Sequence, residues 1–237
     1  MEPTAVVSYT LHRMSTPRGD PTLLLVPTEL ELRRLLDLGG FPAGLALVET
    51  CGFGPVAAAA RTAALLARLR PARVVLVGIA GSYDVSAHPV GAALEFGECA
   101  IEGIGVGEGA SLLAPPALGF PQWPGRDGAA AIFDRLPLAS ASTDRAPLLL
   151  TTCAASADAT QAAARRRRFP AAAAEDMEGF AVAAACALEG IPLRIVRGIS
   201  NEVGDRRPEH WRIPAALAAA RERALEVLVA PAGRGTR

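Results

Sequence analysis

Short runs of apolar residues alternate along the chain with longer alanine-rich segments in which apolar positions recur at helical spacing. The apolar runs have the length of buried β-strands, and they occur at residues 22–28, 45–50, 73–81, 146–154 and 192–200. The segments with helical spacing that follow them cover residues 29–39, 55–70, 157–169, 177–190 and 213–230, and all of them except the first are rich in alanine. This alternation predicts a sheet with parallel strands, covered by helices on its faces.

The pattern predicts one domain over residues 22–230, with a three-layer α/β/α fold and a mixed central sheet. Residues 1–21 are polar and interrupted by proline, so we expect a loose N-terminal extension there. Residues 231–237 are expected to form a flexible tail. Residues 91–128 are rich in glycine and proline, which predicts one or two strands followed by a long irregular loop.

Charge and composition add little to this picture. The chain has 237 residues with 24 basic and 24 acidic side chains, and every basic one is arginine. This balance gives no reason to expect nucleic acid as a partner. Residues 165–168 are four consecutive arginines, which we interpret as a solvated helix end that complements the helix dipole. Residues 103–109, GIGVGEG, imitate a dinucleotide-binding pattern, but no helix is predicted after them, so a flexible loop is expected.

The cysteines indicate neither a disulfide framework nor a zinc site, because the four of them are scattered singly and no CxxC pair occurs. A reducing cytoplasm is therefore the expected location. No apolar signal-peptide core is found near the N-terminus, and no uninterrupted apolar run is long enough to cross a bilayer. We expect a protein that is neither exported nor inserted in a membrane.

Polar or glycine-rich residues follow three of the predicted strands, at the sheet edge where open α/β folds bind ligands. Glu29 and Glu31 follow the first strand, the segment VGIAGS occupies residues 77–82, and RGISNEVGD occupies residues 197–205. Glu178 opens another helix. Each feature also has a structural interpretation, as an acid in a first helical turn or as a glycine in a turn.

Taken together, these features resemble the nucleoside phosphorylase and nucleosidase superfamily over nearly all of residues 22–230, and within it the branch that cleaves methylthioadenosine and its relatives. The resemblance implies that Glu31 activates water, that Met177 and Glu178 bind the ribose, and that Asn201 stands where adenine-specific members carry an aspartate. It also implies a small-residue loop beside the sugar and base, formed by Gly78, Ile79, Ala80 and Gly81.

Residues 197–217, together with EDMEG and GIAGS, are similar to the futalosine hydrolase group of this superfamily. That group has an asparagine at this place, followed by a charged stretch that contains tryptophan. The resemblance implies hydrolysis of futalosine to hypoxanthine and dehypoxanthine futalosine in menaquinone biosynthesis. It also implies a small-molecule nucleoside substrate, no metal or organic cofactor, and a homo-oligomer assembled through the face that carries residues 55–70.

The residue types suit this chemistry. Cleavage of an N-glycosidic bond needs a sugar clamp, a base clamp and a nucleophile held in line. An ionised Glu178 can accept hydrogen bonds from two ribose hydroxyls, and Glu31 can take a proton from water, with Glu29 as its rival. Phosphorolysis would need cationic groups around a phosphate, and the resemblance implies that these would be arginines just before the small-residue loop. Residues 74–77 there are apolar and Arg73 lies too early on the strand, so hydrolysis is favoured.

Asn201 offers one donor and one acceptor, which match O6 and a protonated N7 of a 6-oxopurine. A flipped amide could instead face adenine, and the proton for the leaving base would come from solvent or from a neighbour such as Asp205. His210 and Trp211 could cover the substrate, or Trp211 could only pack on the last helix. The alternatives are a 6-oxopurine nucleoside phosphorylase, an adenine-releasing nucleosidase and a noncatalytic nucleoside-binding protein.

Overall fold

The computed structural model describes residues 21–126, 128–139 and 146–230. The expected N-terminal extension lies outside these residues except for Pro21, and the expected tail at 231–237 lies outside them entirely. The first strand begins at Thr22.

Within the described residues, nine strands form one mixed sheet. The strands are β1 (Thr22–Val26), β2 (Leu47–Thr50), β3 (Arg73–Ser82), β4 (Ala93–Glu95), β5 (Glu98–Glu102), β6 (Arg135–Pro137), β7 (Leu148–Thr152), β8 (Ala172–Asp176) and β9 (Leu193–Glu202). β1 pairs in parallel with both β2 and β3, and β5, β7 and β8 form a second parallel group.

The long strand β3 joins the two parts of the sheet. It pairs in parallel with β9 from Val74 to Ser82, and its last two residues, Gly81 and Ser82, also pair antiparallel with β8. The register between β3 and β9 shifts between Ala80 and Gly81, so the end of β3 lies between β9 and β8 and pairs with both. β4 and β6 are short antiparallel additions to β9 and β5.

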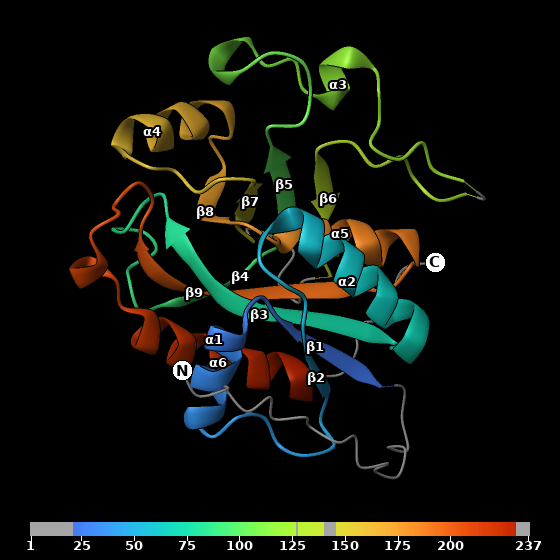
Figure 1. Cartoon of the computed structure of the whole chain (residues 1–237), viewed down its shortest axis with the longest axis vertical. Coiled ribbons are helices and arrows are strands. Elements are labelled where there is room, and N and C mark those ends of the chain that lie inside the picture. The colour runs from blue at the N-terminus through green and yellow to red at the C-terminus, as the bar shows by residue number, and fades with distance from the viewer. Residues whose placement is uncertain (1–20, 127, 140–145, 231–237) are drawn as a thin grey trace, which may run out of the picture.

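Helices cover both faces of the sheet, which gives the three layers that the sequence predicts (Figure 1). α1 (Glu29–Asp37) and α6 (Ile213–Val229) cover one face, and their core includes Leu35 and Leu217. α2 (Gly54–Leu69) and α5 (Gly179–Leu188) cover the other face, where Phe180 is buried. α4 (Ala159–Arg168) packs near the ends of β7 and β8 with a smaller core.

Two interpretations of the sequence need correction. The segment from Gly78 to Gly81 is not a loop: it continues β3 to Ser82, because β9 and then β8 supply hydrogen-bond partners for its backbone. The arginines at 165–168 are not simply a solvated helix end. Arg165 binds Glu102 and Glu175, and Arg168 also binds Glu102, so these side chains tie α4 to the sheet.

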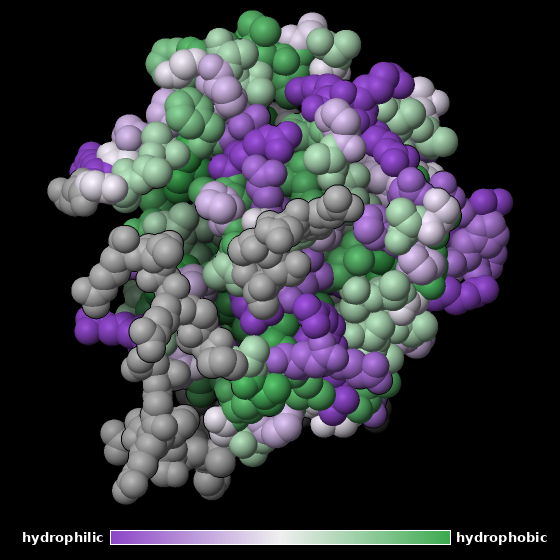
Figure 2. All heavy atoms as spheres, turned by 180° about the vertical axis from the view of Figure 1, so that it is seen from behind, coloured by the Kyte–Doolittle hydropathy of each residue, from purple (hydrophilic) through white to green (hydrophobic). Residues whose placement is uncertain are grey.

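The segment after β5 agrees with its composition. β4 and β5 are followed by a 3-10 turn at Gly109–Ser111 and by the short helix α3 (Pro115–Leu118), with irregular backbone between them. Hydrophilic and hydrophobic residues are interspersed on the described part of the surface seen in Figure 2. Among the described helices, none has both the length and the apolar character needed to cross a membrane.

Candidate active site

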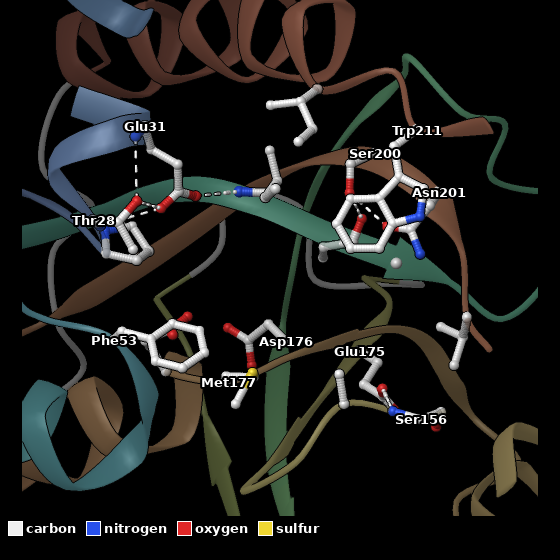
Figure 3. A pocket seen from close by; sticks show the side chains of 18 of the residues that line it. Thr28, Glu31, Phe53, Ser156, Glu175, Asp176, Met177, Ser200, Asn201 and Trp211 are labelled. Atoms are coloured by element: carbon white, nitrogen blue, oxygen red, sulfur yellow. Dashed lines mark hydrogen bonds between the residues drawn. The ribbon is translucent and has the colours of Figure 1, made fainter. Parts of the chain in front are cut away.

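A pocket lies where the β1–α1 junction, the ends of β3 and β9, and the β8–α5 junction meet (Figure 3). Seven of the eight residues expected from the resemblance line this pocket. They are Glu31, Ile79, Ala80, Gly81, Met177, Glu178 and Asn201. Gly78 lies behind the wall rather than on it. Residues far apart in the sequence therefore meet because their strands end at the same edge of the sheet.

Glu31 is buried, and its carboxylate is held from two sides. Thr28 is the N-cap of α1, and both its backbone N–H (3.1 Å) and its hydroxyl (2.6 Å) donate to Oε2 of Glu31, which completes a capping box. The backbone N–H of Ile79 donates to Oε1 at 3.0 Å. Glu29, in contrast, is exposed, accepts a hydrogen bond from Thr50 and does not line the pocket. Of the two acids, only Glu31 lies where it could contact a molecule bound in the pocket.

Glu178 immediately precedes α5 but does not cap it, since its side chain makes no hydrogen bond to that helix. Instead, Oε1 accepts the backbone N–H of Gly54, the first residue of α2, at 3.0 Å, and Oε2 lies 3.5 Å from Arg197. Burial raises the pKa of Glu178 to about 7, and Arg197 only partly offsets this effect. The carboxylate therefore changes its charge near neutral pH.

Arg197 is the fully buried cation of the site. Its guanidinium binds Asp176 through Nη2 at 2.6 Å, while Nη1 makes no hydrogen bond within the described residues. A β-carbon at Gly78 would overlap Nη1 of Arg197 and would also crowd Oε1 of Glu31. Gly78 is thus required because its missing side chain leaves room for the arginine and the carboxylate to lie side by side.

Asp176, rather than Glu178, satisfies the start of α5. One carboxylate oxygen accepts from the backbone N–H of Gly179 at 2.8 Å, and the other accepts from Thr151 at 2.6 Å. Together with the ion pair to Arg197, the carboxylate of Asp176 thus accepts hydrogen bonds from a backbone N–H, a hydroxyl and a guanidinium. Asp176 therefore holds the arginine in place and fixes the turn that carries Met177 and Glu178.

Asn201 lies near the end of β9, with its amide orientation determined by its neighbours. Nδ2 donates to the carbonyl of Glu202 at 2.8 Å, and Oδ1 accepts from the hydroxyl of Ser200 at 2.7 Å. Because a carbonyl can only accept, the amide nitrogen must face Glu202. One N–H and one lone pair of Asn201 remain for a ligand. Gly81, its partner on β3, keeps the space beside Nδ2 open.

Across the pocket from Asn201, the loop after β7 is fixed by a buried carboxylate. Glu175 accepts from both the backbone N–H and the hydroxyl of Ser156, each at 2.7 Å. Tyr83 and Arg165 donate to the same carboxylate. Ser156 and Glu175 line the pocket and lie together in Figure 3, so this network sets the position of the loop that faces Asn201.

Trp211 lines the pocket, and its indole Nε1 donates to the carbonyl of Asp205 at 3.0 Å. His210 does not line it and instead contacts the carboxylate of Asp205. The geometry does not favour Asp205 as the source of the proton for the leaving base. Its hydrogen bonds, first those from Arg207 and then that from His210, hold its pKa far below the ordinary value, and it does not line the pocket.

The sequence did not point to Arg197, Asp176, Glu175 or Ser156. Arg197 lies within an apolar strand, where a charged residue is rarely buried without a partner. Its position in the sequence could therefore have indicated a buried ion pair. The buried cation of the site comes from β9, directly opposite Gly78, and not from β3. In the ranges that the structure describes, no group of three His, Cys, Asp or Glu side chains is arranged to hold a metal ion.

Comparison with known proteins first defines the class. A family model described as the Phosphorylase superfamily matches residues 147–230, the part of the chain that runs from β7 to α6. A methylthioadenosine/S-adenosylhomocysteine nucleosidase from Colwellia psychrerythraea, solved with adenine, superimposes with a TM-score of 0.69 at 22% identity, over 89% of this chain and 95% of that one. At this identity the likeness establishes a common fold.

Sequence relatives then define the family. A futalosine hydrolase from Streptomyces coelicolor is 35% identical over 193 residues, which cover 78% of each chain. A futalosine hydrolase from Thermus thermophilus is 33% identical over 231 residues, which cover 91% of this chain and 98% of the relative. The chain belongs to the futalosine hydrolase family.

Proposed function

We propose that this protein hydrolyses the N-glycosidic bond of futalosine and releases hypoxanthine and dehypoxanthine futalosine, a step in menaquinone biosynthesis. The observation that carries the proposal is the placement of two buried carboxylates on different walls of one pocket. Glu31 lies on the wall formed by α1 and β3, and Glu178 lies on the wall formed by the β8–α5 junction. A ribose bound between them would have Glu31, as a general base, on one side and Glu178, as an acceptor for its hydroxyls, on the other.

The nucleophile would be a water molecule held by Glu31 and Arg197. A buried donor without a partner is costly, so Nη1 of Arg197 favours an acceptor beside it. A water there would accept from Arg197 and give its proton to Glu31 as it attacks the sugar. Hydrogen bonds from Thr28 and Ile79 fix the carboxylate, so it needs no rearrangement before it acts as the base.

Glu178 would accept hydrogen bonds from the ribose 2′ and 3′ hydroxyls when it is ionised. Met177, the preceding residue on the pocket wall, would pack against the apolar face of the sugar. Ion pairing with Arg197 supports the ionised form, whereas burial opposes it. The sugar clamp is therefore expected to work best above neutral pH.

Asn201 would read the base with the N–H and the lone pair that its protein partners leave unused. These two groups match O6 and a protonated N7 of hypoxanthine. The proton for the leaving base could come from solvent or from Asp205. Because Asp205 is held ionised and does not line the pocket, solvent is the source that we propose.

Hydrolysis is favoured over phosphorolysis by the charges around the buried arginine. Arg197 pairs with Asp176 and Glu178, and Glu31 lies beside it. A phosphate dianion placed there would meet three carboxylates and one cation that is already paired, an arrangement that repels it. A neutral water meets no such repulsion.

The proposal includes a cytoplasmic homo-oligomer that acts on a small-molecule nucleoside and requires no cofactor. Phe53 is 67% exposed and Val56 is 84% exposed at the start of α2. Apolar side chains so accessible on one helix are consistent with association through that face.

The substrate can be tested by incubating the purified protein with futalosine, inosine and methylthioadenosine and separating the free bases by chromatography. We expect kcat/KM to be highest for futalosine and lowest for methylthioadenosine. Equal turnover of the three nucleosides would contradict the substrate assignment, and faster release of adenine would identify an adenine-specific nucleosidase instead.

A further inference from the structure

An exposed arginine stands at the rim of the pocket. Arg206 lines the pocket on the segment between β9 and α6. Its guanidinium carbon lies 4.9 Å from the centre of the Trp211 ring, in a cation–π arrangement. Since the indole of Trp211 is in turn bonded to the backbone at Asp205, the aromatic ring that supports Arg206 is held in place.

The charge of Arg206 is not neutralised by the acids beside it. Both carboxylate oxygens of Asp205 are engaged by Arg207 and His210. Glu202 and Glu209 are exposed on the same segment, and within the described residues neither forms an ion pair or hydrogen bond with Arg206. Arg197, the other arginine of the site, is instead paired with two acids.

The chemistry of a nucleoside determines which part of it can reach this rim. In the proposed complex, the base faces Asn201, the 2′ and 3′ hydroxyls face Glu178, and Glu31 approaches C1′. All three of these side chains are buried. The 5′ carbon is the remaining point from which a substituent can leave the ribose. Such a substituent can pass the indole of Trp211, which lies on the pocket wall beside Arg206.

We propose that Arg206 binds an anionic group, a carboxylate, at the end of the substrate's 5′ substituent, while Trp211 contacts the apolar part of that substituent. This inference rests on the proposed nucleosidase function and adds a specificity determinant to it. Arginine suits the role because its planar fork can donate two parallel hydrogen bonds to a carboxylate while it stacks on an aromatic ring.

The test uses two synthetic inosines that differ in one group: a 5′-(3-carboxypropylthio) derivative and the corresponding carboxamide. We expect the wild-type protein to prefer the acid in kcat/KM by roughly fivefold, since a partly exposed ion pair is worth about 1 kcal/mol. Arg206→Met keeps an apolar side chain over Trp211 but removes the charge. In this variant the preference should fall to about one through a rise in KM for the acid.

Arg126→Met is the matched control, because Arg126 also stacks on a tryptophan, Trp123, but does not line this pocket. It should retain the wild-type preference. A wild-type ratio near one, or a ratio that Arg206→Met leaves unchanged, would overturn the assignment. So would equal loss in both variants, which would indicate a general effect of net charge.

A binding measurement separates this inference from the proposed function. Calorimetric titration of both inosines into Glu31→Gln, in which turnover is strongly reduced, measures the preference for the acid as a ratio of affinities. Failure of the wild-type protein to cleave any inosine would refute the nucleosidase function. Equal affinity of Glu31→Gln for the acid and the amide would refute the role of Arg206.

Discussion

Gly78 and Arg197 lie opposite each other on the parallel strands β3 and β9, and the guanidinium of Arg197 occupies space that any β-carbon at Gly78 would need. The same space borders the carboxylate of Glu31. A glycine on one strand therefore allows a buried cation from the next strand to reach the acid on α1, and the geometry of the proposed nucleophile site depends on both residues.

Gly78→Ala should lower activity much more than it lowers stability. The added methyl would push Arg197 or Glu31 out of position, and a displacement of about 1 Å at a reacting group can cost on the order of a hundredfold in rate. Steady-state kinetics and thermal unfolding of the same preparation test this expectation. Near-normal kcat with a folded variant would show that the close approach of these groups is not needed.

Glu31→Gln should reduce kcat by about a hundredfold to ten-thousandfold, the usual contribution of a general base. The glutamine oxygen can still accept from Thr28 in the capping box, whereas the amide nitrogen cannot accept from Ile79; the fold and inhibitor binding should therefore be preserved at a modest cost in stability. Glu29→Gln is the control, because Glu29 begins the same helix but is exposed outside the pocket. If Glu29→Gln were the inactive variant, the assignment of the base would be wrong.

Glu178→Gln should lose most of the activity while the protein still folds. Hydrogen bonds to a charged acceptor are worth about 1.5–3 kcal/mol each, so we expect a drop of at least tenfold in kcat/KM for a ribonucleoside. Near-normal rates in a correctly folded variant would remove the sugar-clamp role from Glu178.

The pH dependence of the wild-type protein should report the same residue. Burial raises the pKa of Glu178 to about 7, and the ionised form is the hydroxyl acceptor. As the pH falls through about 7, Glu178 gains a proton and kcat/KM should decrease. The stability contribution runs the other way: it is greatest below the unfolded pKa and is lost as the pH rises through about 7. Glu178→Gln should abolish both effects, and a persistent acidic limb near pH 7 in kcat/KM would assign it to another group.

Asn201→Asp should raise the ratio of adenine to hypoxanthine nucleoside cleavage. A protonated aspartic acid can donate to N7 and accept from the 6-amino group, whereas its ionised form repels O6. A mismatched polar pair in a closed site costs on the order of tenfold to a thousandfold in relative rate. The measurement is kcat/KM for matched inosine and adenosine substrates in both proteins, and an unchanged ratio would mean that Asn201 does not read the base.

The sequence predicted the layers and the mixed sheet because apolar spacing is a local property of each element. It also predicted that Glu31, Glu178 and Asn201 follow strands that end at one edge of the sheet. It could not show that Arg197 points toward Gly78, since that contact depends on the register between β3 and β9. Nor could it separate a solvated Arg165 from one buried against Glu102 and Glu175, because these partners lie on other strands.

The apolar run over residues 73–81 predicted a strand, whereas the resemblance implied a loop at Gly78–Gly81, and the structure shows β3 continuing to Ser82. Glycine and alanine in sequence favour a loop when only local preference is considered. Here β9 and β8 both pair with this segment, a β-carbon at Gly78 would overlap Arg197, and one at Gly81 would lie close to Val203. Tertiary pairing therefore outweighed the local preference.

The most direct test of the account is the release of base from futalosine in buffer without phosphate. Purified wild-type protein should release one hypoxanthine for each futalosine consumed, at a rate that added phosphate does not increase, with the unphosphorylated sugar product detected by mass spectrometry. Release that requires phosphate and yields a sugar 1-phosphate, or no release of hypoxanthine under either condition, would contradict it.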